Sequence, residues 1–330
     1  LASVVLPRTM RYSLKDLTSF LGVAHTEAHR ALSDAQATRG VFMELLRRMA
    51  QLEPGLLTHV SNLATRSRWA IAPLLANLQG SKVSDEPSAF GLTGLDMDRL
   101  AVRLGRPEKR RSDSSLSDLD EERIVDLLGP KGPFAPNFSG FEHRPEQEEM
   151  LREVTRAIYQ GHHLVVEGGT GVGKSMAYLL PAVLFAVSKG QRVVISTNTI
   201  NLQEQLWRKD IPALVEVLEQ AGLVEQGVVK AALLKGRGNY LCLRRWNYLA
   251  RSESPTVEDA RLLSKTAVWL QDTVTGDRGE INLAGRDSFT WNRISAGEKG
   301  WCPGIRDGGP CFLRGARERA EQAHIVVVNH

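Results

Sequence analysis

The sequence predicts an α/β fold over about residues 141–330, in which helices cover a parallel sheet. Short apolar runs alternate there with longer segments whose apolar residues recur at helical spacing. A glycine-rich segment, 168–173, joins the first apolar run to the helix that follows it. Parallel strands need a crossover between them, so this alternation is typical of a sheet with helices on both faces.

The same patterns place the individual elements. Apolar runs predict strands at 163–167, 192–196, 228–234 and 325–328. Helical spacing predicts helices at 145–160, 175–187 and 202–220. Pro145 lies in the first turn of the first of these helices and Gly161 ends it, as is usual for helix termini.

The first 140 residues differ from the rest in composition and in the spacing of their apolar residues. Helical spacing predicts helices at 13–21 and 38–49, so residues 1–50 read as a small helical piece. Residues 51–140 are interpreted as a partly disordered linker with some helices. Within it, 108–120 is charged and rich in serine and aspartate, and 129–140 is rich in glycine and proline. We therefore expect domain boundaries near residues 50 and 140.

Composition argues against several classes of protein. The longest apolar stretch is far shorter than the roughly 20 residues of a membrane span, and the first residues lack the pattern of a signal peptide. Three cysteines among 330 residues do not make a disulfide framework. The net charge of +4 favours a polyanionic partner only weakly. We expect a cytoplasmic protein with no membrane contact, and no obligate protein partner is evident.

A phosphate-binding pattern, G-x-x-x-x-G-K-[ST], lies between the first predicted strand and its helix. Its glycines let backbone N–H groups turn toward phosphate oxygens, and the N-terminus of the next helix attracts negative charge. Lys174 is expected to reach the outer phosphates of a nucleoside triphosphate, and the Ser175 hydroxyl to bind Mg²⁺. The alternative is a glycine-rich turn with an accidental lysine. The residues of the pattern are Gly168, Gly169, Thr170, Gly171, Val172, Gly173, Lys174 and Ser175.

Two further groups of polar residues flank this loop in the sequence. Arg144 and Gln147 lie at the start of helix 145–160, where the glutamine amide can offer a donor and an acceptor to adenine. Any helix start can have this composition, which is the alternative. Thr197, Thr199 and Gln203 lie where a strand turns into a helix, and their groups suit the phosphate oxygens of a nucleic-acid strand. The alternative there is ordinary helix capping.

Cysteine and histidine positions suggest two metal sites. Cys242, Cys302 and Cys311 lie near glycine or proline turns, which suits a metal or iron–sulfur site, although buried cysteines are also common. His29 and Asp34 lie at the start of a predicted helix, where the aspartate could hold a divalent cation and the histidine could take a proton from water. The alternative is a pair of capping and solvated side chains.

Taken in order, these motifs resemble the DinG branch of the XPD-like helicases from about residue 141 to the last residue. The stretch Lys-Gly-Arg-x-Asn-Tyr-x-Cys at 235–242 is unusual outside this group, and Gln147 is placed as in the Q motif of superfamily 2 helicases. The other segments that carry the resemblance are 144–147, 168–175, 196–206 and 316–330.

The resemblance implies a RecA-like P-loop domain, here the incomplete first helicase domain. It implies ATP hydrolysis coupled to movement on single-stranded or forked DNA, in the 5′ to 3′ direction, with ATP and Mg²⁺ as ligands. Lys174 and Ser175 would be the catalytic residues of this part, and Arg144 and Gln147 would contact adenine. The DNA contacts would come from Thr197, Thr199, Gln203 and Arg237.

Residues 1–50 resemble the end of a DnaQ-like, DEDDh-type 3′–5′ exonuclease domain, which has an RNase H-like fold. His29 and Asp34 match its last motif, His-x4-Asp, so the resemblance implies a catalytic histidine and a metal-binding aspartate.

The resemblance also implies a [4Fe–4S] cluster in an insertion at about 235–315. Cys242, Cys302 and Cys311 occupy three of its four ligand positions, and Asp307 occupies the fourth. A carboxylate can bind iron, although it is a harder ligand than a thiolate. The alternative is that the cluster is lost and the thiols are ordinary residues.

Several parts of the family pattern are not among these residues. A DEAH box is expected after Asn329-His330, followed by a second RecA-like domain, and the first exonuclease motifs are expected before Leu1. We therefore expect an internal fragment of an exonuclease–helicase fusion, which binds nucleotide without turnover. The alternatives are a nuclease whose helicase part only delivers DNA, and a scaffold that binds nucleotide and DNA.

Overall fold

The computed structural model describes residues 1–25, 30–80, 97–113, 116, 120–137, 141–297 and 309–329. The chain forms two compact units. The first unit contains residues 1–105 and 236–315, and the second unit contains residues 106–235 and 316–330. The boundaries of these compact units differ from the domain boundaries predicted near residues 50 and 140. The predicted boundaries concern functional domains and stay a prediction.

The second unit is built on a three-stranded parallel sheet. Its strands are β1 (Val193–Thr197), β2 (Ala231–Leu234) and β3 (Ile325–Asn329), in the order β1-β3-β2. Ile325 of β3 lies opposite Val193 on one side and Ala231 on the other. The last strand in sequence is therefore the central strand, and the predicted α/β fold with a parallel sheet is confirmed.

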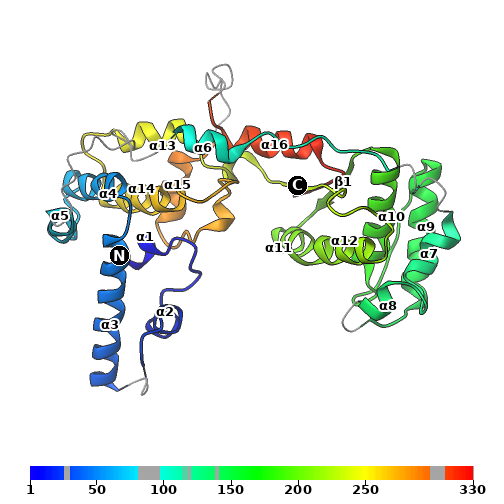
Figure 1. Cartoon of the computed structure of the whole chain (residues 1–330), viewed down its shortest axis with the longest axis horizontal. Helices are drawn as coiled ribbons and strands as arrows, with labels where there is room; N and C mark the ends of the chain where they lie inside the picture. The colour runs from blue at the N-terminus through cyan, green and yellow to red at the C-terminus, as the bar shows by residue number, and fades with distance from the viewer. Residues whose placement is uncertain are drawn as a thin grey trace. The chain divides into compact units, whose positions relative to one another are not determined.

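Helices surround this sheet where the apolar periodicity predicts them. They are α9 (Pro145–Gln160), α10 (Lys174–Lys189), α11 (Ile200–Gln205) and α12 (Ile211–Gln220), with a π-helical turn (Leu206–Asp210) between the last two. Gly161 ends α9 and Gly190 ends α10, both in the left-handed conformation that suits glycine at this position. Helix α9 lies alongside α10 (Figure 1, green).

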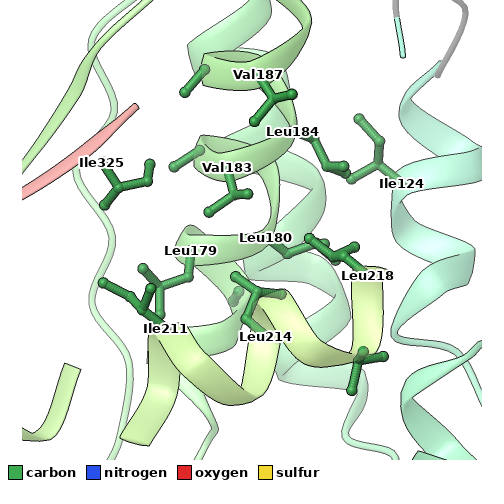
Figure 2. Close-up of a cluster of buried hydrophobic side chains, with 14 of the residues drawn as sticks. Ile124, Leu179, Leu180, Val183, Leu184, Val187, Ile211, Leu214, Leu218 and Ile325 are labelled. Carbon is green, nitrogen blue, oxygen red and sulfur yellow. The ribbon is translucent and has the colours of Figure 1, made fainter. Parts of the chain in front are cut away.

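Helix α10 forms the centre of the hydrophobic core of the second unit. Its Leu180, Val183 and Leu184 have no exposed surface, because other elements cover them on several sides. Figure 2 shows the side chains that meet α10, which come from Ile124 of α7 (Glu121–Leu127), from Ile211, Leu214 and Leu218 of α12, and from Ile325 of β3. Apolar packing therefore holds α10, which begins directly after the phosphate loop, along most of its length.

The strand predicted at 163–167 is absent from the described structure, so that prediction is wrong. These residues have no strand conformation, and the side chain of Val165 is 97% exposed. A strand is stable only when a neighbour accepts and donates its backbone hydrogen bonds. None of the described strands pairs with this run, although its apolar composition is that of a buried strand.

The segment 51–140 differs from the expected linker in its described parts. It contains α4 (Pro54–Arg66), α5 (Ala72–Gly80), α6 (Met97–Leu104), α7 and α8 (Phe134–Asn137). Leu57, Val60 and Leu63 of α4 are at most 1% exposed. The periodic apolar residues of α4 therefore pack into a core instead of remaining solvated.

A charged stretch of the same segment is tied to the second unit. The Arg110 guanidinium donates to the carbonyl oxygens of Gly190, Glu321 and Ala323, which lie at the ends of α10 and α16 (Phe312–Gln322). His324, with no exposed surface, binds the same stretch through its Nε2, which is 2.9 Å from the Arg111 carbonyl oxygen. The carbonyl oxygens at helix C-termini accept hydrogen bonds from arginine side chains. The arginines of this charged stretch therefore bind it to the second unit.

The first unit is helical. Its elements are α1 (Ala2–Val5), α2 (Leu14–Leu21), α3 (Ala31–Ala50), α4, α5, α6, α13 (Leu243–Ala250), α14 (Val257–Trp269), α15 (Asp287–Ile294) and the start of α16. Its core includes the fully buried Trp246, Trp269 and Trp291. Glu280 accepts hydrogen bonds from Trp269, Thr273, Thr275 and Arg8, so N-terminal residues are part of the same unit as 236–315.

No helix in the described part of the chain combines the length and apolar character of a membrane span.

Candidate nucleotide-binding site

The phosphate loop has the backbone geometry that its glycines permit. Gly171 and Gly173 have φ angles of +85° and +80°, in the left-handed region that other residues adopt at a cost. Helix α10 begins directly after Gly173. The free N–H groups of its first turn, together with the helix dipole, therefore favour an anion at this position.

Lys174 is folded back onto the loop. Its ammonium donates to the carbonyl oxygen of Gly168, at 2.8 Å, and also to that of Gly169. A Cβ at Gly168 would lie 3.1 Å from the Cδ of Lys174, so the glycine also gives the lysine room. The ammonium is thus held inside the loop by two neutral acceptors, which a phosphate can replace with a charged one.

Gln147 and Arg144 hold the loop from the start of α9. The Gln147 amide donates to the carbonyl oxygen of Gly173, at 2.8 Å. The Arg144 guanidinium donates to the carbonyl oxygen of Gly171 and pairs with Glu142. The structure therefore brings the two predicted adenine-binding residues to the phosphate loop, and their contact with adenine stays a prediction.

Ser175 has a partner that the sequence did not indicate. Its side chain lies near the hydroxyl of Tyr178, one turn further along α10, and affects the pKa of that hydroxyl. Burial raises the pKa of Tyr178, the bond to Ser175 opposes this, and the nearby Asp210 adds to the rise. Tyr178 therefore keeps its proton at neutral pH. Tyrosine at one-turn spacing from the serine is the signal that could have identified it.

The turn between β1 and α11 presents only some of its predicted DNA-binding residues. Thr199 is exposed and caps α11, its hydroxyl accepting from the N–H of Leu202. Thr197 is 3% exposed, and Gln203 has no exposed surface. In this conformation, therefore, a nucleic-acid strand can reach Thr199 but neither Thr197 nor Gln203.

The lysine and arginine of the 235–242 stretch lie in different surroundings. Lys235 donates to Glu204 at 2.7 Å, and Glu204 also pairs with Arg208. Burial alone would raise the pKa of Glu204, but the bonds from Arg208 and Lys235 outweigh it and lower the pKa. Arg237 lies half-buried in the short 3-10 helix Arg237–Asn239, and its Nε is buried without a hydrogen-bond partner. Its DNA contact stays a prediction.

The predicted cluster ligands are only partly within the described residues. Cys242 and Cys311 are free, half-buried thiols. Cys242 precedes α13, and its N–H donates to the carbonyl oxygen of Ile294. Cys302 and Asp307 lie outside the described residues. No group of three or more metal-binding side chains lies within the described part of the chain.

In the N-terminal part, Asp34 is hydrogen-bonded to a histidine that the sequence did not single out. The Nε2 of His25 lies 2.7 Å from the Asp34 carboxylate. His29, the predicted base, lies outside the described residues. His25 is nine residues before Asp34, a separation that no single helix brings together, so periodicity alone could not identify the pair.

Comparison with known proteins agrees with this site. Residues 144–216, which include the phosphate loop and the turn before α11, match the family described as DEAD/DEAH box helicase. The whole chain is 27% identical to the 3′-5′ exonuclease DinG of Bacillus subtilis, of which it covers 34%.

Two further relatives match about two thirds of the chain or slightly less. The ATP-dependent DNA helicase YoaA of Haemophilus influenzae is 37% identical over 64% of the chain, and the ATP-dependent helicase DinG of Mycobacterium tuberculosis is 38% identical over 58%. The chain spans 31% of each of these relatives. The chain is thus similar to the helicase relatives named DinG and YoaA, and the part that matches the DEAD/DEAH box helicase family lies in its α/β unit.

Proposed function

We propose that this chain is the ATP-binding part of a helicase that couples ATP hydrolysis to movement on single-stranded DNA. The geometry of the phosphate loop carries this proposal. The loop ends in two left-handed glycines, it encloses an ammonium, and it leads into a helix buried along its length. A relative named ATP-dependent DNA helicase YoaA supports the choice of substrate.

Each residue of the site has a role in the proposal. Lys174 would leave the carbonyl oxygens of the loop and donate to the outer phosphates of ATP. Ser175 would hold Mg²⁺, which neutralises charge on the phosphates when it is bound. Arg144 and Gln147 would exchange their loop contacts for adenine.

The DNA strand would contact the exposed side of the turn before α11, where Asn198, Thr199 and Ile200 are exposed. Single-stranded or forked DNA is the proposed substrate, and 5′ to 3′ is the proposed direction. The test is strand displacement by the complete gene product, on substrates with a 5′ or a 3′ single-stranded arm. ATP-dependent displacement on the 5′ arm that is lost in Lys174→Ala supports the proposal. No nucleotide binding by the unmodified protein would refute it.

A second proposed activity is 3′–5′ exonuclease action by the N-terminal part. The close pair His25 and Asp34 favours it, because a carboxylate held by a histidine at a helix start suits a metal-dependent nuclease. A relative over the whole chain is named 3′-5′ exonuclease DinG. Asp34→Ala in the complete gene product should abolish metal-dependent trimming of a single-stranded oligonucleotide without changing ATP binding.

The proposed [4Fe–4S] cluster would have Cys242, Cys302, Asp307 and Cys311 as ligands. The two described cysteines suit it, since both are free and neither is fully buried. Anaerobic purification followed by iron and sulfide analysis tests it. Asp307→Cys should harden a cluster against oxygen, whereas an iron-free, colourless protein from cells that build clusters would refute it.

A further inference from the structure

Gln203 joins the start of α11 to the carboxyl end of the sheet. Its side chain has no exposed surface. Its amide nitrogen lies 3.3 Å from the carbonyl oxygen of Val327 in β3 and 3.5 Å from that of Leu234 in β2. Both are long for N–H···O hydrogen bonds, so a small shift of α11 would break them.

The orientation of this amide is fixed by its surroundings. Both neighbours are carbonyl oxygens, so the nitrogen must face them and the Oε1 must point away. That Oε1 is buried and has no hydrogen-bond partner. A buried acceptor without a partner is destabilising. For packing alone, an apolar side chain of the same size would fill this position better.

Two more bonds connect the same turn to the last residues of β3. The Thr197 hydroxyl lies 3.2 Å from the carbonyl oxygen of Val328 and shares its proton between this oxygen and that of Thr199, also at 3.2 Å. The Asn329 amide donates to the carbonyl oxygen of Thr197 at 2.9 Å. The opposite side of the turn is free for a ligand, because Thr199 is exposed and Ile200 is 57% exposed. One short turn therefore has an inner side bonded to β3 and an outer side open to solvent.

The next residue of α11 extends the connection to β2. Glu204 accepts from Lys235 at 2.7 Å, directly after β2 ends at Leu234. Residues Gln203 and Glu204 thus contact the ends of two neighbouring strands. In P-loop enzymes, the groups that act on the triphosphate lie at the carboxyl ends of such parallel strands.

We propose that Gln203 is a positioning residue that couples nucleic-acid binding at the turn to nucleotide binding at the phosphate loop. This inference rests on the proposed function. A strand bound at Thr199 and Ile200 shifts α11, the Gln203 amide follows, and the end of β3 moves with it. Helix α10 packs on β3, as Val183 and Ile325 show in the shared core (Figure 2), so the shift reaches the start of α10 and the phosphate loop.

The experiment measures this coupling as a ratio of dissociation constants. A fluorescent ATP analogue is titrated into the 330-residue chain with and without a saturating single-stranded oligothymidylate. We expect DNA to change the affinity for the analogue by about fivefold or more. Gln203→Met, which removes the amide and keeps the volume, should reduce this change to less than about twofold. Each ligand alone should still bind within about twofold of its normal affinity.

Gln220→Met is the matched control, because Gln220 is exposed on α12 and bonds only to Glu216. It should keep the full coupling. Thr197→Val removes a second bond to β3 without changing shape, and it should reduce the coupling even if Gln203→Met does not fold.

The outcomes separate the two proposals. Coupling that persists in Gln203→Met and in Thr197→Val overturns the role of Gln203. The same conclusion follows if both ligands bind the unmodified chain independently. If the unmodified chain fails to bind the ATP analogue at all, the proposed function itself fails.

Discussion

The side-chain amide of Gln147 occupies the space in which a Cβ of residue 173 would lie. Its nitrogen is 2.8 Å from the carbonyl oxygen of Gly173 and would be only 2.2 Å from an added Cβ. The glycine is therefore required for two reasons, its φ of +80° and the contact with Gln147. This contact joins the start of α9 to the start of α10 and fixes the shape of the phosphate loop.

Gly173→Ala should abolish binding of a fluorescent ATP analogue, because the new methyl group would displace Gln147 and distort the loop. Gly161→Ala is the matched control. It has a similar φ of +72°, but nothing lies within 4 Å of its added Cβ. Both substitutions should cost roughly 1–2 kcal/mol of stability from the left-handed conformation. Equal loss of nucleotide binding in both variants would show that the contact with Gln147 is unimportant.

Lys174→Ala should weaken binding of the ATP analogue by about ten- to a hundredfold, since hydrogen bonds to charged groups contribute roughly 1.5–3 kcal/mol. Lys189→Ala, an exposed lysine in the last turn of the same helix, should leave the affinity unchanged. Isothermal titration of both variants compares them directly. A normal affinity in Lys174→Ala would mean that the loop does not hold the triphosphate through this ammonium.

The second unit should lose stability in mild acid because of His324. Its Nδ1 accepts from the N–H of Lys230 at 3.1 Å, which requires the neutral ring. Burial lowers the pKa of His324, the bond to the Arg111 carbonyl oxygen opposes this, and Arg110 and Lys230 lower it further. The folded state thus binds the proton more weakly than the unfolded state does. The stabilisation is complete above about pH 6.5 and is lost as the pH falls below it toward the lower folded pKa.

Hydrogen exchange of the peptide that contains 228–234, corrected for its intrinsic pH dependence, checks this prediction. Protection should fall as the pH is lowered below about 6.5 in the unmodified chain, and His324→Gln should flatten the profile. His163→Gln, at an exposed position, is the control. An unchanged profile in His324→Gln would assign the acid sensitivity to other groups.

Asp287→Ala should destabilise the first unit by about 3–5 kcal/mol, because it leaves a buried ammonium without its carboxylate and with only the carbonyl oxygen of Asn282 as acceptor. Lys265 is 2% exposed, and Asp287 is the carboxylate to which its ammonium donates. Asp272→Ala is the control, since Asp272 pairs with Arg8 at the surface and should cost at most about 1 kcal/mol. Urea unfolding followed by tryptophan fluorescence compares the two, because Trp246, Trp269 and Trp291 all lie in this unit.

The spacing of apolar residues predicted those helices and strands of the second unit whose structure depends on local sequence. Helix α9 lies at Pro145–Gln160 as predicted, and α10, β1 and β3 are within two residues of the predicted bounds. The prediction of a strand at 163–167 was wrong. Apolar composition shows that a segment can form a buried strand, but it does not show whether a neighbouring strand is present to bond with it. The packing of α4 was not predicted, because the whole of 51–140 was interpreted from its charged stretch at 108–120 and its glycine- and proline-rich stretch at 129–140.

The candidate site shows a similar limit. The glycine-rich loop precedes a helix as its pattern predicts, since the pattern is local and the conformation depends on glycines, and its binding of phosphate stays a prediction. Gln203 and Thr197 were expected to face DNA, but a polar residue at a strand-to-helix turn can also bond inward to the ends of neighbouring strands. Contacts between distant residues, such as His25 with Asp34, depend on the tertiary fold and leave no periodic signal.

The residues just before α9 have a practical consequence for dividing this protein. A recombinant piece that begins at Phe141, where the sequence texture changes, would lack five apolar side chains that fill the core beside α9 and α10. Exposed to water, the surface they leave would favour aggregation of such a piece. A piece that begins at Arg106 would keep these side chains, and the core beside α9 and α10 would stay covered. The five side chains are Leu116, Ile124, Val125, Leu128 and Phe134.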